Sequence, residues 1–124
     1  MDSSLTDLLI LEDDGLWHSI IDLLLPSQLS YSFVSDGKAF EQFLASGSRA
    51  RLYTLDDYVP GVSSSAVKPR FVEHYALLQG FDAEADVWYH GSSPSDATLR
   101  FCSWHEIPVV ERMALGSAAM DYFF

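Results

Sequence analysis

Two groups of acidic residues stand where their carboxylates could act together. Glu12 and Asp13 follow the apolar run 7–11, and Asp56 follows the run 51–55. Carboxylates a few ångströms apart repel one another, and this repulsion raises their pKa values unless a cation enters. A hard divalent cation that prefers oxygen ligands, such as Mg²⁺, relieves the repulsion. A carboxylate beside such a cation can also attack phosphorus and form an aspartyl phosphate, and Glu12, Asp13 and Asp56 could supply this chemistry.

The segments before and between these acids alternate between strand-like and helix-like patterns. Short apolar runs typical of strands cover residues 7–11, 29–34 and 51–55, and helical spacing covers residues 15–25 and 38–45. This β-α-β-α-β order predicts an α/β protein with a parallel sheet that carries helices on both faces. In such folds the ligand site lies at the carboxyl ends of the strands. We therefore expect both acidic groups at this edge of the sheet.

The rest of the chain continues the alternation. The serine-rich stretch 62–66 predicts a loop. Lys68-Pro69 can open a helix that ends near Gly80, and residues 87–90 predict a fourth strand rich in aromatic side chains. Because no linker or internal repeat interrupts it, the whole chain, residues 1–124, is predicted to form a single domain.

The last thirty residues allow two interpretations. In the first, residues 98–104 form the fifth strand and residues 109–124 the last helix, which leaves the fourth helix shortened or missing. In the second, residues 95–102 form a short helix and residues 107–112 the fifth strand. We favour the first interpretation, because it gives the last helix one apolar face, although Gly116 weakens that helix.

Composition limits the classes of function. The 124 residues include 18 Asp plus Glu and 7 Lys plus Arg, for a formal net charge of −11, and 48% are hydrophobic. High hydrophobicity excludes intrinsic disorder, and the acidity argues against binding to nucleic acid or to an anionic membrane surface. Cys102 is the only cysteine, and the opening residues 1–4 lack the basic region of a signal peptide. We therefore expect no intrachain disulfide and a cytoplasmic location.

Three stretches together resemble the receiver domains of bacterial two-component response regulators. They are LLILEDDGLWHSIIDLLL, SYSFVSDGKAFEQFLASG and RLYTLDDYVPG. The last resembles the strand that carries the phospho-acceptor aspartate, because Asp56 stands four residues before Pro60-Gly61. The resemblance covers residues 5–61 and implies a CheY-like, flavodoxin-like domain with a five-stranded parallel sheet.

The resemblance also implies a role for each acid. Asp56 would be the phospho-acceptor, and Asp14 and Asp57 would be bystanders that deepen the negative potential. The implied cofactor is Mg²⁺, and its ligands would be Asp13, Asp56, the backbone carbonyl of Tyr58 and, through water, Glu12.

The second half departs from the receiver pattern at two positions. The family has a serine or threonine at the end of strand four that binds a phosphoryl oxygen, and here Ser92 or Ser93 could fill that role. The family also has a lysine at the end of strand five, where the first interpretation places Ile107 and the second places Glu111 or Arg112. The only lysines of the chain are elsewhere in the sequence, at positions 38 and 68. We read Arg112 as a surface helix arginine, and the four histidines as structural residues.

These observations predict an atypical stand-alone receiver that accepts a phosphoryl group on Asp56 in an Mg²⁺-dependent reaction. Its donor would be a histidine kinase or a histidine phosphotransfer protein, and its output would be contact with a downstream protein. A homodimer is compatible with this role. Beyond self-phosphorylation and dephosphorylation of Asp56 we expect no enzyme activity.

Two alternatives remain. A pseudo-receiver would keep the fold as an interaction module without the phosphorylation switch, as the missing lysine suggests. A phosphohydrolase of the haloacid dehalogenase type would need Asp-x-Asp after the first strand, which Glu12-Asp13-Asp14 does not match.

Overall fold

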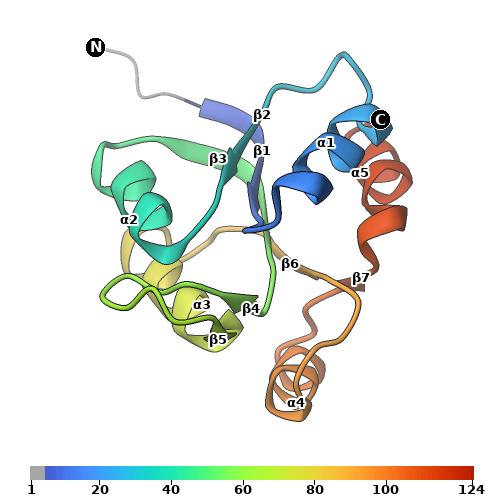
Figure 1. Cartoon of the computed structure of the whole chain (residues 1–124). Helices are drawn as coiled ribbons and strands as arrows, with labels where there is room; N and C mark the ends of the chain where they lie inside the picture. Colours follow the sequence, from blue (N-terminus) through green and yellow to red (C-terminus); the bar gives the residue numbers. More distant parts are fainter. Residues whose placement is uncertain (1–4) are drawn as a thin grey trace.

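Five parallel strands form the central sheet of the computed structural model, which describes residues 5–124 (Figure 1). Residues 1–4, on which the expectation of no signal peptide rests in part, lie outside the described residues. From one edge to the other the strands are β2 (Tyr31–Val34), β1 (Leu5–Leu11), β3 (Arg49–Leu55), β6 (Val87–His90) and β7 (Val109–Val110).

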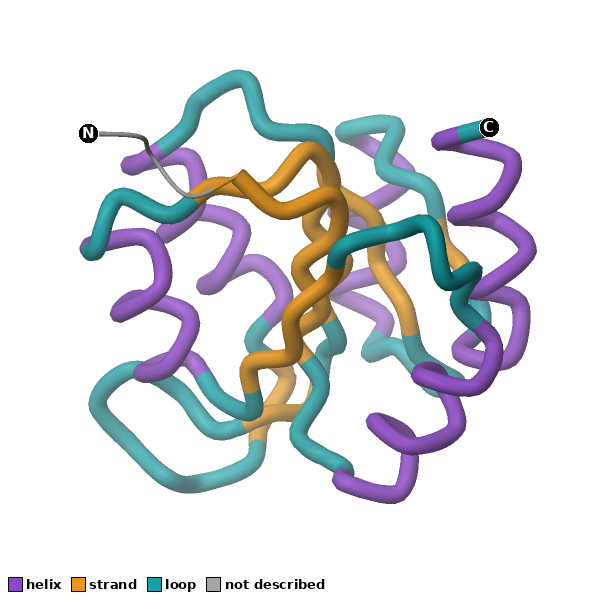
Figure 2. The backbone as a smooth tube through the Cα atoms, turned by 90° about the horizontal axis from the view of Figure 1, so that it is seen from above, coloured by secondary structure: helices purple, strands orange, loops and turns teal. Residues whose placement is uncertain are grey.

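Helices cover both faces of this sheet (Figure 2). One face carries α1 (Gly15–Leu24) and α5 (Leu115–Phe123), and the other carries α2 (Gly37–Ala45), α3 (Phe71–Phe81) and α4 (Asp96–Trp104). The flavodoxin-like single-sheet architecture expected from the sequence is therefore confirmed. No helix within residues 5–124 is long and apolar enough to cross a membrane.

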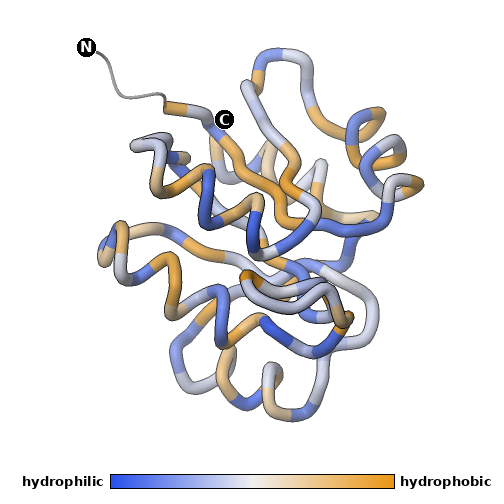
Figure 3. The backbone as a smooth tube through the Cα atoms, turned by 60° about the vertical axis from the view of Figure 1, so that its left-hand side comes forward, coloured by the Kyte–Doolittle hydropathy of each residue, from blue (hydrophilic) through white to orange (hydrophobic). Residues whose placement is uncertain are grey.

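The carboxyl half of β1 is buried on both faces of the sheet. Its residues Leu8, Leu9, Ile10 and Leu11 are all fully buried, and β1 is coloured hydrophobic along this stretch in Figure 3. Alternate side chains of the run enter two different cores, one beneath α1 and α5 and the other beneath α2 and α3. A strand covered on both faces needs a continuous apolar run, which the sequence supplies.

The strands are in register at their carboxyl ends. Leu11 pairs with Val34 on one side and with Leu55 on the other, and Leu55 pairs with Tyr89. His90 pairs in turn with Val110 at the far edge. The residues that follow β1, β3, β6 and β7 consequently meet at one edge of the sheet.

The favoured interpretation of the last thirty residues is wrong, and the second one is right. Residues 98–104 belong to α4, which is present with nine residues, and the fifth strand of the sheet is β7. The side chain of Ser95 accepts a hydrogen bond from the backbone N–H of Thr98 at 3.2 Å and caps α4. Thr98 and Cys102, four residues apart, form the buried side of this helix. Ser95 as a cap and Asp96 in the first turn indicate the start of a helix. The apolar run 98–104 indicates a strand instead, and the two patterns compete.

A small hairpin encloses the serine-rich loop. Its strands are β4 (Tyr58–Val59) and β5 (Lys68–Pro69), which pair antiparallel. Lys68-Pro69 therefore forms a strand and does not open a helix, and α3 begins at Phe71. The guanidinium of Arg70 fixes the loop by donating to the carbonyls of Val59, at 3.0 Å, and Ala66, at 2.9 Å.

Gly116 allows α5 to approach α1 closely. A Cβ atom at this position would lie 2.5 Å from the carbonyl oxygen of Leu24. We expect Gly116→Ala to lower the free energy of unfolding by about 1–3 kcal/mol in urea denaturation, because the backbone of α1 would have to move. Gly80→Ala in α3 is the matched control, since a Cβ there meets nothing within 4 Å, and it should raise stability by about 0.5–1 kcal/mol. Equal stability of Gly116→Ala and the unaltered protein would contradict this account of the contact.

Candidate functional site

Four buried or partly buried side chains meet at the carboxyl edge of the sheet. Glu12 directly follows β1, Asp56 directly follows β3, and His90 is the last residue of β6. Arg112 opens the short 3₁₀ helix η1 (Arg112–Ala114), two residues after β7. Glu12 and His90 are fully buried, and Asp56 is 3% exposed. We call these four residues the carboxyl-edge cluster.

Nitrogen-bearing and acidic side chains pair within the cluster. His90 Nε2 lies 3.1 Å from Glu12 Oε1. Arg112 Nη2 donates to Asp56 Oδ2 at 2.9 Å, and its Nε lies 3.2 Å from Glu12 Oε1, as an ion-pair contact without hydrogen-bond geometry. The guanidinium thus contacts both carboxylates. The positive charge that the pocket needs is supplied from within the chain.

The two carboxylates of the cluster titrate differently. Burial alone would raise the pKa of Glu12, but the hydrogen bond with His90, the charges of His90 and Arg112 and a backbone N–H outweigh it and lower that pKa. For Asp56, burial dominates and the nearby charge of Glu12 adds to it, so the pKa of Asp56 is raised. Glu12 is therefore the more firmly ionised partner, and Asp56 is the one that takes up a proton more easily.

Asp13 remains outside the cluster. It is partly buried, and no group of three metal-ligating side chains within residues 5–124 includes it at mutual distances of 4.8 Å. Burial and the charge of Glu12 raise the pKa of Asp13. The chain brings Glu12 and Asp56 together, as the sequence predicts, but Asp13 does not complete their set.

Asp57 is not a bystander. Its side chain is fully buried on the other side of the strand end, beneath α3 and α4. One carboxylate oxygen accepts from Ser95 N at 2.8 Å, and the other accepts from Thr98 Oγ1 at 2.9 Å and from Phe71 N at 3.3 Å. Asp57 therefore connects the first turns of two helices.

The remaining predicted site residues lie at the surface. Ser92 and Ser93 are both exposed in the loop after β6, and Tyr58, whose backbone carbonyl is the predicted ligand, is an exposed residue of β4. The position at the end of the fourth strand of the sheet, where the receiver pattern has a serine or threonine, is held by His90. The serine candidates are thus displaced along the chain from the strand end.

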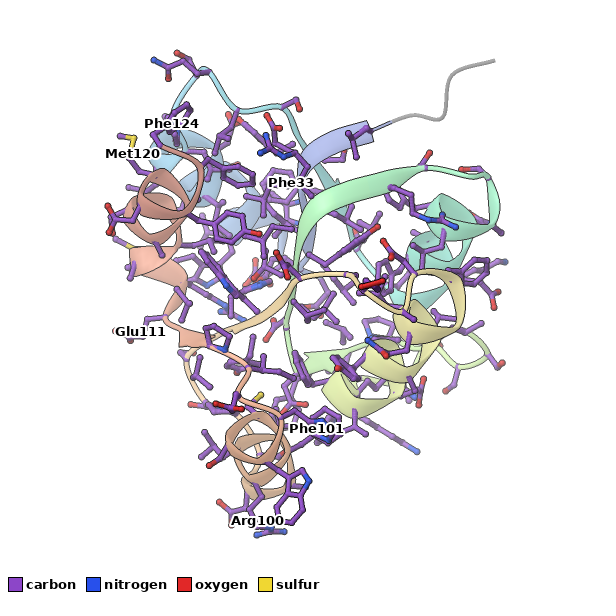
Figure 4. All side chains as sticks on the ribbon, turned by 180° about the vertical axis from the view of Figure 1, so that it is seen from behind. Phe33, Arg100, Phe101, Glu111, Met120 and Phe124 are labelled. Atoms are coloured by element: carbon purple, nitrogen blue, oxygen red, sulfur yellow. The ribbon has the colours of Figure 1, made fainter. Side chains whose placement is uncertain are left out.

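His90 and Arg112 belong to the cluster, although the sequence does not predict them as site residues. His90 closes the apolar strand 87–90, so its side chain had to point into the protein on one face or the other. Arg112 was one of three candidates for the lysine position. Figure 4 shows the neighbouring Glu111 pointing outward, and Glu111 is exposed, while the arginine contacts both acids. The position of Arg112 just after the fifth strand indicates its role, but only when that strand is placed at β7.

The side chains of the cluster differ from the all-oxygen ligand set that Mg²⁺ prefers. Among residues 5–124, the side chains that could share a cation are Glu12, Asp56 and His90, whose ligand atoms lie within 4.8 Å of one another. One of the three is an imidazole, whereas Mg²⁺ prefers oxygen ligands and retains water. Both carboxylates also contact the guanidinium of Arg112. The charge and the donor atoms both differ from an all-oxygen Mg²⁺ site.

Comparison with known proteins shows the fold. No protein-family model and no curated protein sequence matches the chain. Among solved structures, the chain is similar to RcsB from Salmonella enterica serovar Typhimurium bound to promoter rprA in the presence of phosphomimetic BeF₃⁻. The TM-score is 0.72 at 13% identity, over 95% of this chain and 67% of that one.

The phosphorylated cyanobacterial phytochrome response regulator RcpA is similar as well. Its TM-score is 0.67 at 15% identity, over 96% of this chain and 91% of that one. The chain therefore has the fold of a response-regulator receiver over nearly its whole length, as the resemblance of its first half implied.

Proposed function

We propose that this chain, which has a receiver fold, is a signalling module that binds a protein partner without phosphorylation of Asp56. The contact of Arg112 with both Glu12 and Asp56 carries this proposal. A receiver pocket whose two carboxylates already contact an internal cation has less need of Mg²⁺ to relieve their repulsion. The chain would then present its binding surface without a switch that depends on phosphorylation.

The hydrogen bonds of Asp56 support this proposal. Its Oδ2 accepts from Arg112 Nη2 at 2.9 Å, and its Oδ1 accepts from the backbone N–H of Asp57 at 2.7 Å. Each oxygen that could attack phosphorus therefore already accepts a hydrogen bond, one of them from a cation, and this weakens Asp56 as a nucleophile. Phosphoryl transfer depends on cations that neutralise charge on the transferring group, and the guanidinium of Arg112 is engaged with both acids instead.

The competing function is that of a phosphorylated receiver served by a histidine kinase or a phosphotransfer protein. The raised pKa of Asp13 favours it, because burial and the charge of Glu12 leave this carboxylate in need of a cation. In that case Arg112 would act in place of the family's lysine. Neither function involves turnover of an external substrate.

Phosphorylation separates the two functions. Incubated with Mg²⁺ and acetyl phosphate, the unaltered protein should show no added phosphoryl mass by intact mass spectrometry. The double variant His90→Thr/Arg112→Lys, which has the side chains of the receiver pattern, should gain one phosphoryl group. That gain should disappear when Asp56→Asn is added, and circular dichroism would establish that each variant is folded.

A phosphoryl group on Asp56 of the unaltered protein would overturn the proposal. If Asp56→Asn abolished this phosphorylation, the competing function would be established. A tenfold change in partner affinity upon phosphorylation, about 1.4 kcal/mol, would further identify Asp56 as a switch.

A further inference from the structure

We infer that Glu12, Asp56 and His90 form a binding site for a divalent transition metal of the Zn²⁺ class, with Arg112 as the competing internal cation. The inference deepens the proposed function and rests on it, because it assigns a ligand to a pocket that holds no phosphoryl group. Its starting point is the mismatch between this donor set and Mg²⁺.

The donor atoms have the spacing of a metal site. All three lie within 4.8 Å of one another, and His90 Nε2 is 3.1 Å from Glu12 Oε1. With bonds of about 2.0–2.2 Å to nitrogen and oxygen, neighbouring ligands of a four-coordinate Zn²⁺ are separated by about 3.3 Å. The closest pair therefore needs to move by only a few tenths of an ångström to share an ion.

The ligand types select the metal. An imidazole nitrogen with two carboxylates suits Zn²⁺ and its neighbours in the first transition row, whereas an all-oxygen set suits Mg²⁺. Two ionised carboxylates and a neutral imidazole carry a charge of −2, which a divalent ion cancels completely. The single charge of Arg112 cancels half of it. Burial of Glu12, Asp56 and His90 makes this difference large, because buried charges need compensation.

Thr54 supplies the outer contact that metal-bound histidines usually have. Its Oγ1 lies 2.7 Å from His90 Nδ1, and both residues are fully buried. When His90 donates Nε2–H to Glu12, the threonine hydroxyl can donate to Nδ1. When Nε2 binds a metal, the same hydroxyl can accept from Nδ1–H and orient the ring. The site is therefore prepared for both states without a change of partner.

Displacement of Arg112 would report metal binding. The guanidinium carbon lies 5.0 Å from the ring centroid of Trp17, and Arg112 begins the 3₁₀ turn that leads into α5. A metal that takes both carboxylates releases the guanidinium and with it the start of α5. The fluorescence of Trp17 should then change in step with occupancy.

Titration with metal alone tests the site. Calorimetry with Zn²⁺ and visible absorption with Co²⁺ should show one ion per chain, and Mg²⁺ at the same concentration should show none. His90→Asn and Glu12→Gln should each weaken Zn²⁺ binding at least tenfold. Arg112→Gln, which removes the competitor, should strengthen it about tenfold. His105→Asn is the matched control, since this exposed histidine lies outside the cluster, and it should leave binding unchanged.

Zn²⁺ binding that is the same in His90→Asn and in the unaltered protein would overturn the inference, because the ion would then lie elsewhere. Mg²⁺ binding as tight as Zn²⁺ binding would overturn it too. The proposed function is contradicted by a different observation, namely phosphorylation of Asp56 in the presence of Mg²⁺. If Arg112→Gln does not fold, the Zn²⁺ affinity of His90→Asn relative to the unaltered protein still tests the inference.

Discussion

Asp57→Ala should lower the free energy of unfolding by about 4 kcal/mol, measured by urea denaturation at pH 7. The substitution removes three hydrogen bonds to a buried carboxylate, from Ser95 N, Thr98 Oγ1 and Phe71 N. Hydrogen bonds to charged groups contribute about 1.5–3 kcal/mol each, and the contributions of neighbours are not fully additive. The backbone N–H groups of Phe71, which is buried, and of Ser95, which is partly buried, would also lose this partner.

The loss should be concentrated in α3 and α4. The carboxylate of Asp57 lies at the first turns of both helices, where a negative charge is favoured by the helix dipole. Hydrogen exchange should therefore accelerate at the amides of Phe71, Ser95 and Thr98 before it accelerates in β1. Asp57→Asn should fall between the alanine variant and the unaltered protein, because the amide keeps one acceptor oxygen and turns an NH₂ group toward a donor.

Asp121→Ala is the control for a general effect of charge. Asp121 is an exposed residue of α5, so its removal changes the net charge by the same amount and should alter stability by less than about 0.5 kcal/mol. Comparable losses in both variants would contradict the account of Asp57 as a connector between helices.

The two adjacent acids show what could be predicted from sequence and what could not. Residues 51–55 predict a buried strand, and Asp56 was selected from its place after that strand and before Pro60-Gly61. Neighbouring residues of an extended chain point to opposite sides, so Asp57 could not share the pocket of Asp56. What it would contact depended on where α3 and α4 begin. Those starts were uncertain, and the role of Asp57 was therefore missed.

The places of His90 and Arg112 also depended on where the later strands and helices lie, and for this reason they were not predicted. Both reach the carboxyl-edge cluster because β6 and β7 continue the sheet beyond β3, in the order that the structure has. β7 has only two residues, Val109 and Val110, and a two-residue strand gives almost no periodic signal. The apolar run 98–104 has the composition of a strand and was favoured in its place. Acids after the long buried strands could be identified, whereas the basic residues at the ends of the short strands β6 and β7 required the tertiary pairing.

Arg112→Gln should lower the free energy of unfolding by about 3 kcal/mol at pH 7, because it leaves two buried carboxylates without their guanidinium. Glutamine keeps much of the length of the side chain, so the loss reports charge rather than packing.

The deficit of Arg112→Gln should shrink as the pH falls from 7 toward 5. Without the arginine, the pKa of Asp56, already raised by burial, rises further, and Glu12 loses part of what lowers its pKa. Both folded-state pKa values are then higher than in the unaltered protein, so the folded variant takes up protons more readily than the folded unaltered protein does. Protonation therefore stabilises the variant at lower pH relative to the unaltered protein.

Arg100→Gln is the matched control for Arg112→Gln, because Arg100 projects into solvent from α4 (Figure 4). It should change stability by less than about 0.5 kcal/mol at either pH. Urea denaturation of both variants at pH 7 and pH 5 makes the comparison. A deficit of Arg112→Gln that stays constant over this range would mean that the arginine stabilises the fold by packing on Trp17, and not by compensating the carboxylates. The compensation of the two carboxylates by Arg112, on which the proposed function depends, would then lose its support.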